Sequence, residues 1–190
     1  LVNKDGSAFR IHDPYTEIVY DGSNDKYISS STYPDLPAYP KGTSGLVSSF
    51  KVNKDVYNWT STGFKIADQN DLVIYEMHFR DFTSTGDIPG ALGKLDYLSS
   101  LGVNAVELMP IQEFDGNDSW GYNPCSYFAL DKAYGTRNMY KQFIDGCHAR
   151  GMAVIVDVVY NQATGAHPYA KLYWDSKNNK TASDNPWFNV

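Results

Sequence analysis

The run of seven residues from Ala153 to Val159 constrains the fold more than any other part of the sequence. Apart from Asp157 it is apolar without alternation, which is typical of a strand buried on both faces of a parallel sheet. Two similar runs, Leu72–His78 and Val103–Met109, come earlier in the chain. The sequence therefore predicts three strands of one parallel sheet.

Helical patterns separate these three runs. Between the first two, leucines at helical spacing predict one helix over Ile88–Leu101, which Gly102 ends. Before the third run, Thr136 is a suitable N-cap and Gly151 ends a second helix. The apolar positions of that second helix are Tyr140, Phe143, Ile144 and Cys147. Strands alternating with helices indicate βαβ units and an α/β fold class.

The flanking regions have a different composition. Residues 1–70 are rich in Ser, Asp, Asn, Gly and Pro, and predict an extended, β-rich linker from a preceding module with short strands such as Ile18–Tyr20. Residues 71–190 form the α/β part, within which Ile111–Gly135 reads as a long polar loop. After Val159 no helix or strand pattern is evident. Three strands with two helices leave a face and both edges bare, so we expect the N-terminal portion of a larger α/β protein.

Charge and composition exclude several classes of partner. The chain has 16 basic and 22 acidic residues, a net charge of −6, without a block of Lys and Arg. It therefore lacks the positive surface that binds nucleic acid or anionic membranes. No apolar run approaches the roughly 20 residues that span a bilayer. Cys125 and Cys147 lack the spacing of a zinc or redox motif, and Cys147 is expected to be a buried apolar residue.

Asp157 is the anomaly within the third strand. A carboxylate that is buried there without a partner costs several kcal/mol, so it needs a hydrogen-bond partner or a solvated pocket. It lies toward the carboxyl end of the strand, which is where α/β barrels and open α/β sheets bind ligands. The 15 tyrosines are compatible with a carbohydrate surface, but also with ordinary core and strand positions.

Four segments in order resemble the alpha-amylase family of glycoside hydrolases, in particular its pullulanase and debranching members. They are Leu72–Phe82, Gly102–Pro110, Trp120–Pro124 with the aromatic and glycine positions after it, and Asp157–Asn161. Asp13-Pro-Tyr15 is similar to the arm that joins a β-sandwich module to the barrel in debranching members.

The resemblance implies a partial (β/α)8 (TIM) barrel, about its first three βα units. It also implies action on α-linked glucans such as starch, pullulan or glycogen, by a retaining mechanism with an Asp nucleophile and a Glu general acid. Those carboxylates belong to later strands, so no catalytic residue is assigned in this chain and both are expected beyond Val190. The remainder of the same catalytic domain is then the chain's partner. Its compartment is left open, with an extracytoplasmic one favoured.

The resemblance also implies a set of substrate-binding residues: Trp120, Tyr122, Asn123, Asp157 and Gln162. Tyr122 matches the tyrosine that stacks on the sugar at the cleavage subsite, although it could also merely pack its loop. Asp157 matches the acidic residue of the third-strand signature, either orienting its neighbours or holding backbone groups. Asn161 matches the signature Asn, which is a calcium ligand in many amylases and structural in others; the cofactor is thus none, or Ca²⁺.

Gln162 departs from the family pattern, which has a His at this position. A Gln amide can still donate a hydrogen bond to a sugar hydroxyl, but it cannot become cationic. His78 and Glu107 are interpreted as a core or pocket-wall residue and a buried barrel-lining residue. Two alternatives stay open: a non-catalytic glycan-binding or interaction module, and an acid and nucleophile pair made by Glu107 and Asp157.

Overall fold

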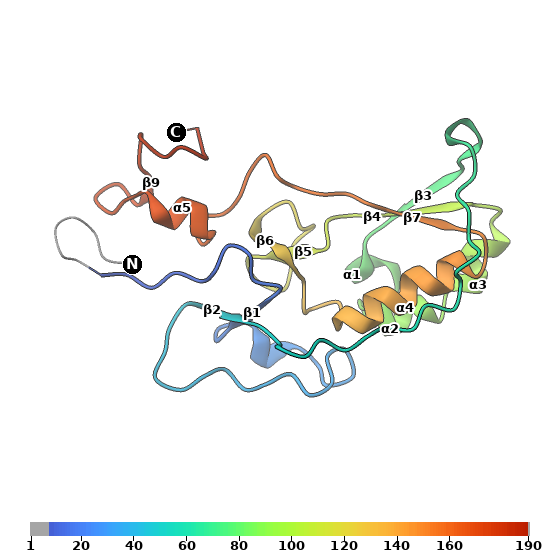
Figure 1. The fold of residues 1–190 in the computed structure, drawn as a ribbon, viewed down its shortest axis with the longest axis horizontal. Coiled ribbons are helices and arrows are strands. Elements are labelled where there is room, and N and C mark those ends of the chain that lie inside the picture. Colours follow the sequence, from blue (N-terminus) through green and yellow to red (C-terminus); the bar gives the residue numbers. More distant parts are fainter. Residues whose placement is uncertain (1–7, 190) are drawn as a thin grey trace.

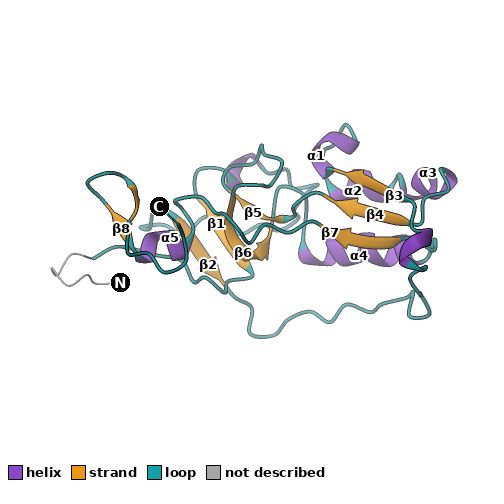
Figure 2. Cartoon of the chain, turned by 90° about the horizontal axis from the view of Figure 1, so that it is seen from above, coloured by secondary structure: helices purple, strands orange, loops and turns teal. Residues whose placement is uncertain are grey.

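The computed structural model describes residues 8–189, and it contains a parallel sheet of three strands toward one end of the molecule (Figure 2). The strands are β3 (Ile74–Met77), β4 (Ala105–Leu108) and β7 (Ala153–Val156), in the order β3-β4-β7. Met77 lies level with Leu108, and Leu108 with Val156, so the three strands end together. The predicted parallel pairing of the three apolar runs is confirmed.

Helices lie on one side of this sheet (Figure 1). They are α1 (Phe79–Phe82), α2 (Ile88–Leu92), α3 (Leu95–Ser100) and α4 (Arg137–His148). The N-cap of α4 is Thr136 as predicted, and its hydroxyl accepts a hydrogen bond from the Met139 N–H at 3.3 Å. The prediction of one continuous helix over Ile88–Leu101 was wrong. The chain leaves helical geometry at Lys94, just after Gly93, a weak helix former.

The core fills the space between the sheet and these helices. Met77, Val106 and Leu108 project from the strands, and Phe143 projects from α4. Phe79 packs its ring edge-on against Phe143, with ring centroids 5.2 Å apart. Each such side chain contributes roughly 1.5–3 kcal/mol through burial. Cys147 is also fully buried in this core, as predicted.

The opposite face of the sheet carries a different set of side chains. Glu76, Glu107 and Ile155 lie level with one another across the three strands. Glu76 is exposed, while Glu107 and Ile155 are half-buried. Glu107 was predicted to be buried but is only half-buried, because the described helices pack on the other face (Figure 1).

A β-hairpin follows the second strand, where the sequence suggested a polar loop. Its strands are β5 (Gln112–Phe114) and β6 (Pro124–Leu130), which pair antiparallel with shifts of register at Glu113. The prediction was wrong here because these irregularities disrupt the simple alternation that marks a strand. The hairpin lies beyond the carboxyl ends of the parallel strands (Figure 2).

The N-terminal segment contains a second antiparallel pair, β1 (Ile18–Asp21) and β2 (Leu46–Ser49). Short 3-10 turns occupy Asp25–Tyr27 and Gln69–Asp71. A buried ion cluster ties this segment to the hairpin, because the Lys132 ammonium contacts both Glu113 and Asp25. Beyond β2 the chain runs extended toward α4 (Figure 2).

Past Val159 the chain forms short elements that the sequence pattern did not predict. They are α5 (Pro168–Leu172), β8 (Trp174–Asp175) and β9 (Lys180–Thr181), and the last two pair antiparallel. Each is too short to carry a recognisable periodicity.

The described residues therefore form a mixed α/β structure with a short parallel sheet, and their strands do not close into a barrel. Within residues 8–189, no helix has the length and apolar character needed to cross a membrane.

Candidate functional site

The candidate site lies at the carboxyl ends of the three parallel strands. Asp157 follows β7 directly, and its backbone N–H donates to the Leu108 carbonyl at 3.0 Å. This bond continues the sheet by one residue and fixes the Asp157 backbone. The predicted position of a carboxylate at the end of the third strand is thus observed.

Tyr122 supplies the partner that Asp157 needs. Its hydroxyl donates a hydrogen bond of 2.7 Å to Asp157 Oδ2, across 35 positions of sequence. This bond to a carboxylate raises the pKa of Tyr122 to about 12, and partial burial adds to the rise. The charges of Glu76 and Glu107 contribute in the same direction, so the carboxylates of the open sheet face influence the site.

Gly121 allows Tyr122 to reach this position. Its φ is +89°, and a Cβ there would lie 2.5 Å from the Pro110 carbonyl oxygen at the end of β4. A side chain would therefore clash with the backbone as well as strain its own dihedral. The loop can approach β4 closely because residue 121 is glycine.

Asn123 is occupied inside its own loop. Its side-chain N–H donates to the Asp115 carbonyl at 3.2 Å, and its side-chain oxygen accepts from the Ser119 hydroxyl. Trp120 is the opposite case, with 60% of its surface exposed. Of these two predicted substrate-binding residues, Trp120 has a solvent-exposed ring, whereas the Asn123 side chain stabilises the turn through hydrogen bonds.

Gln162 contacts the main chain of the same loop. Its side-chain N–H donates to the Tyr122 backbone carbonyl at 2.5 Å, and its backbone carbonyl accepts from the Tyr127 hydroxyl at 3.1 Å. The segment after β7 is thereby fastened to the hairpin at Tyr122 and at Tyr127. Asp157, Tyr122 and Gln162, predicted separately, are brought together in one hydrogen-bonded cluster.

Sequence reasoning missed two residues of this frame, Gln112 and Tyr127. Gln112 is buried on β5, where its side-chain oxygen accepts from the Val159 N–H at 2.7 Å and its N–H donates to the Tyr127 carbonyl at 3.1 Å. A buried amide must satisfy its hydrogen bonds. A pair of polar residues, Gln112 and Glu113, enclosed by the apolar residues Ile111 and Phe114, was the available signal.

His78 is a buried residue at the carboxyl end of β3. Its Nε2 lies 2.8 Å from the Tyr134 hydroxyl. Burial lowers the pKa of His78, and the nearby Arg80 adds to that effect, so the imidazole is neutral at neutral pH. Its prediction as a core or pocket-wall residue is confirmed by this burial.

Asn161 is exposed, just past the site. Within residues 8–189, no group of three or more His, Cys, Asp and Glu side chains could hold a metal ion. Calcium takes six to eight oxygen ligands, usually with several carboxylates. The described residues around Asn161 show no such cluster of carboxylates, and a calcium role for Asn161 stays a prediction.

Comparison with known proteins gives the family. The family model of the alpha amylase catalytic domain matches residues 53–190, which is most of the chain. The chain belongs to the alpha-amylase family. The resemblance seen in the four sequence segments is confirmed.

Relatives and solved structures agree with this assignment. The chain is 42% identical to malto-oligosyltrehalose trehalohydrolase of Arthrobacter ramosus over 122 residues, 64% of this chain and 21% of that protein. A Salmonella typhimurium crystal structure assigned as an alpha amylase superposes with a TM-score of 0.66 at 30% identity, covering 96% of this chain and 29% of the other. The pullulanase SAP of group B Streptococcus, in complex with maltotetraose, gives a TM-score of 0.62 at 25% identity, over 92% and 28% of the two chains.

These alpha-amylase family relatives include debranching-type glycosidases, as the sequence resemblance predicted. The chain spans about a fifth of the length of the Arthrobacter relative that it matches.

Proposed function

We propose that the chain is the first part of the catalytic domain of a retaining glycoside hydrolase that cleaves α-linked glucans. In this proposal it supplies the sugar-binding portion of the cleft, whereas the nucleophile and the general acid lie on strands after Val190. The observation that carries the proposal is the hydrogen bond from Tyr122 to Asp157 at the carboxyl ends of parallel strands, since α/β barrels bind their substrates at that end.

The fold enters the proposal as an incomplete barrel. We take β3, β4 and β7 as the first three strands of a (β/α)8 barrel that residues 71–190 begin. Residues 1–70 are then the end of a preceding module. The bare face with Glu76 and Glu107 would be the barrel interior, and both sheet edges would pair with further strands.

In this site Tyr122 would stack its ring on the sugar at the cleavage subsite. The Asp157 carboxylate holds the Tyr122 hydroxyl, which fixes the ring plane, and its second oxygen can accept from a sugar hydroxyl. A ring that is already fixed loses little entropy when the sugar binds. Trp120, exposed beside it, offers a second apolar surface.

Gln162 would act mainly by positioning Tyr122. One of its two amide N–H groups is used on the Tyr122 carbonyl, so the other can donate to a sugar hydroxyl. Gln162 thus takes a position where the family has His, and it does so without a group that titrates near neutral pH.

The first experiment is to sequence the reading frame past the codon for Val190. The proposal expects further βα units, with an Asp on the next strand and a Glu on the one after. The protein encoded by that frame should hydrolyse soluble starch or pullulan, and NMR of the first product should show the α-anomer.

A substitution then tests the site itself. Tyr122→Phe keeps the ring but removes the bond to Asp157, and a hydrogen bond to a charged group is worth roughly 1.5–3 kcal/mol. We expect kcat/KM to fall roughly tenfold to a hundredfold. Phe128→Ala, which removes an aromatic ring from the same hairpin, is the control and should change kcat/KM little. A frame that stops at Val190, together with glucan binding but no turnover, would favour a glycan-binding module instead.

A further inference from the structure

A separate groove continues from Gln162 away from Tyr122. Its volume is about 480 Å³, which is within the range of small-molecule sites. The loop from Asn161 to Gly165 forms one side, and the β8–β9 hairpin with residues 187–189 forms the other. Because Gln162 lines the groove and also bonds to Tyr122, the groove adjoins the candidate site.

The lining of this groove suits a neutral ligand rich in hydroxyl groups. Its polar side chains are amides and hydroxyls together with one ammonium group: Asn161, Gln162, Thr164, Asn179, Lys180, Thr181 and Asn189. Two indole rings, Trp174 and Trp187, supply the apolar surface. Flat rings bordered mainly by uncharged donors and acceptors are well matched to the two faces and the rim of a sugar.

The Trp187 ring is held in place before any ligand binds. It stacks on Tyr169 with centroids 4.9 Å apart and planes inclined by 15°, while 48% of its surface stays exposed. Buried Asn185 fixes the backbone of both partners, since its side chain accepts from the Trp187 backbone N–H at 2.8 Å and donates to the Tyr169 backbone carbonyl at 3.0 Å. A ring fixed on one face has little rotamer freedom to lose on the other.

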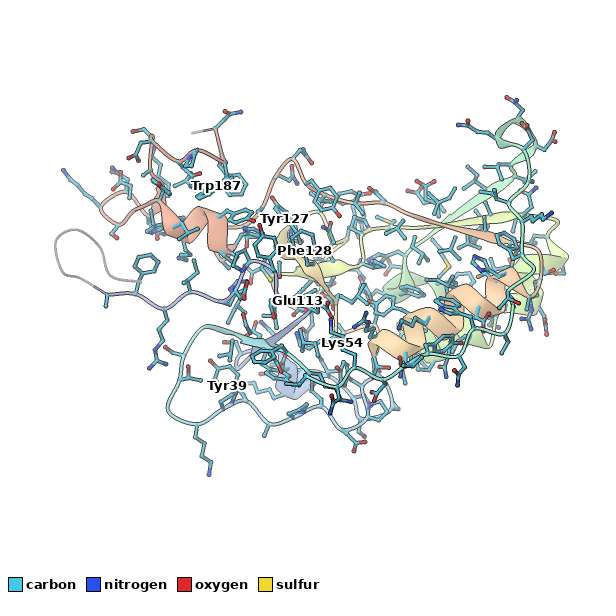
Figure 3. The ribbon with its side chains drawn as sticks, in the orientation of Figure 1. Tyr39, Lys54, Glu113, Tyr127, Phe128 and Trp187 are labelled. Atoms are coloured by element: carbon cyan, nitrogen blue, oxygen red, sulfur yellow. The ribbon has the colours of Figure 1, made fainter. Side chains whose placement is uncertain are left out.

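Trp174, on the same side of the groove as Trp187, is also held by its neighbours. A Cβ at residue 165 would lie 2.8 Å from the Trp174 ring, so the indole packs directly on Gly165. The Lys171 ammonium lies 4.2 Å from the centre of that ring. A row of rings, Tyr127, His167, Tyr169 and Trp187, connects the hairpin to this part of the molecule. Figure 3 labels Tyr127 and Trp187, the two ends of this row.

We propose that this groove is an additional sugar subsite, in which Trp187 stacks on a glucose unit of an α-glucan that extends several units beyond the one at Tyr122. The inference rests on the proposed function, because it extends the same cleft. It assigns a binding role to the segment after Asn161, where the sequence pattern alone indicates none.

The test is the affinity of the full-length protein for thio-linked maltooligosaccharides of increasing length, which resist hydrolysis, by titration calorimetry. A distant subsite is reached only by the longer ligands. Trp187→Ala should therefore weaken binding of the longest ligand about tenfold, as expected for one aromatic contact, and leave the disaccharide unchanged. Trp187→Phe should retain part of the affinity, and its thermal midpoint reports whether the segment stays folded.

Trp59→Ala is the matched control, because Trp59 is a tryptophan of similar exposure, 44%, outside the groove. It should alter no affinity. Equal losses for short and long ligands, or no loss with Trp187→Ala, would overturn the subsite. If the subsite is overturned in this way, but the unaltered protein binds the ligands and Tyr122→Ala abolishes binding, the proposed function still holds. Failure of the unaltered protein to bind any ligand would overturn both.

Discussion

The two faces of the β3-β4-β7 sheet differ in what surrounds them and in what they do. On one face Met77, Val106 and Leu108 pack against helices and form the core. On the other, Glu76 and Glu107 lie level with each other without a described helix over them (Figure 1). The difference teaches that one short sheet can stabilise the chain with one face while the other face and the strand ends carry polar groups.

The largest expected effect is on the covered face. Phe143→Ala empties a fully buried position against Phe79, which costs roughly 3–5 kcal/mol of unfolding free energy. Ile74→Ala, at a strand residue that is 47% exposed, should cost about 1 kcal/mol or less. Chemical denaturation of the two variants measures the contrast. Equal losses would mean that the two faces are equally packed in solution.

A second prediction concerns the outer side of α4. Buried Asp145 accepts hydrogen bonds from the backbone N–H groups of Thr60 and Ser61, which fasten the extended segment to the helix. Burial alone would raise the pKa of Asp145, but these bonds outweigh it and hold the pKa well below its ordinary value of 3.8. Since the folded pKa is the lower one, the stabilisation is present above the unfolded pKa and is lost as pH falls below it.

Asp145→Asn should therefore lower the thermal midpoint at neutral pH, and the gap to the unaltered protein should narrow steadily as pH falls from about 4 toward the lower folded pKa. Asp184→Asn, at an exposed carboxylate near the end of the chain, should leave the midpoint unchanged over that range. A gap that stays constant with pH would show that the Asp145 charge does not stabilise this contact.

The smallest expected effect is on the open face. Glu76 and Glu107 are direct neighbours on adjacent strands, and like charges in such a pair repel. Glu107→Gln should raise the unfolding free energy by roughly 0.5 kcal/mol. Glu76→Gln should do the same, and the double variant should gain no more than either, which a double-mutant cycle measures. Additive gains would mean that the two carboxylates do not interact.

The same contrast explains what the sequence could predict. β3, β4, β7 and α4 have clear patterns because their apolar side chains all contribute to one core. The division of the predicted helix at Lys94 was not visible, since Leu95 and Leu98 stay buried on either interpretation. The hairpin β5–β6 was missed because its shifted register mixes buried polar and apolar residues.

For the site, Asp157 was recognisable as a carboxylate at the end of an apolar strand. Its bond to Tyr122 followed no spacing rule, since 35 positions separate the two residues. The bond from Gln162 to the Tyr122 carbonyl depends on the path of two loops, and a loop path is set by tertiary contacts that a single sequence does not display. The groove lined by Trp174 and Trp187 was not predicted for the same reason, since tertiary contacts also set the path of the segment after Asn161.

The parallel sheet also has a consequence for biosynthesis. Strands β3 and β7 are the outer strands of the described sheet, and each has backbone donors and acceptors on its free side. While a ribosome is still making the polypeptide after β7, these two edges are templates for strands of any other nascent chain nearby. If the proposed barrel continues, pairing of these two edges with its further strands removes both templates.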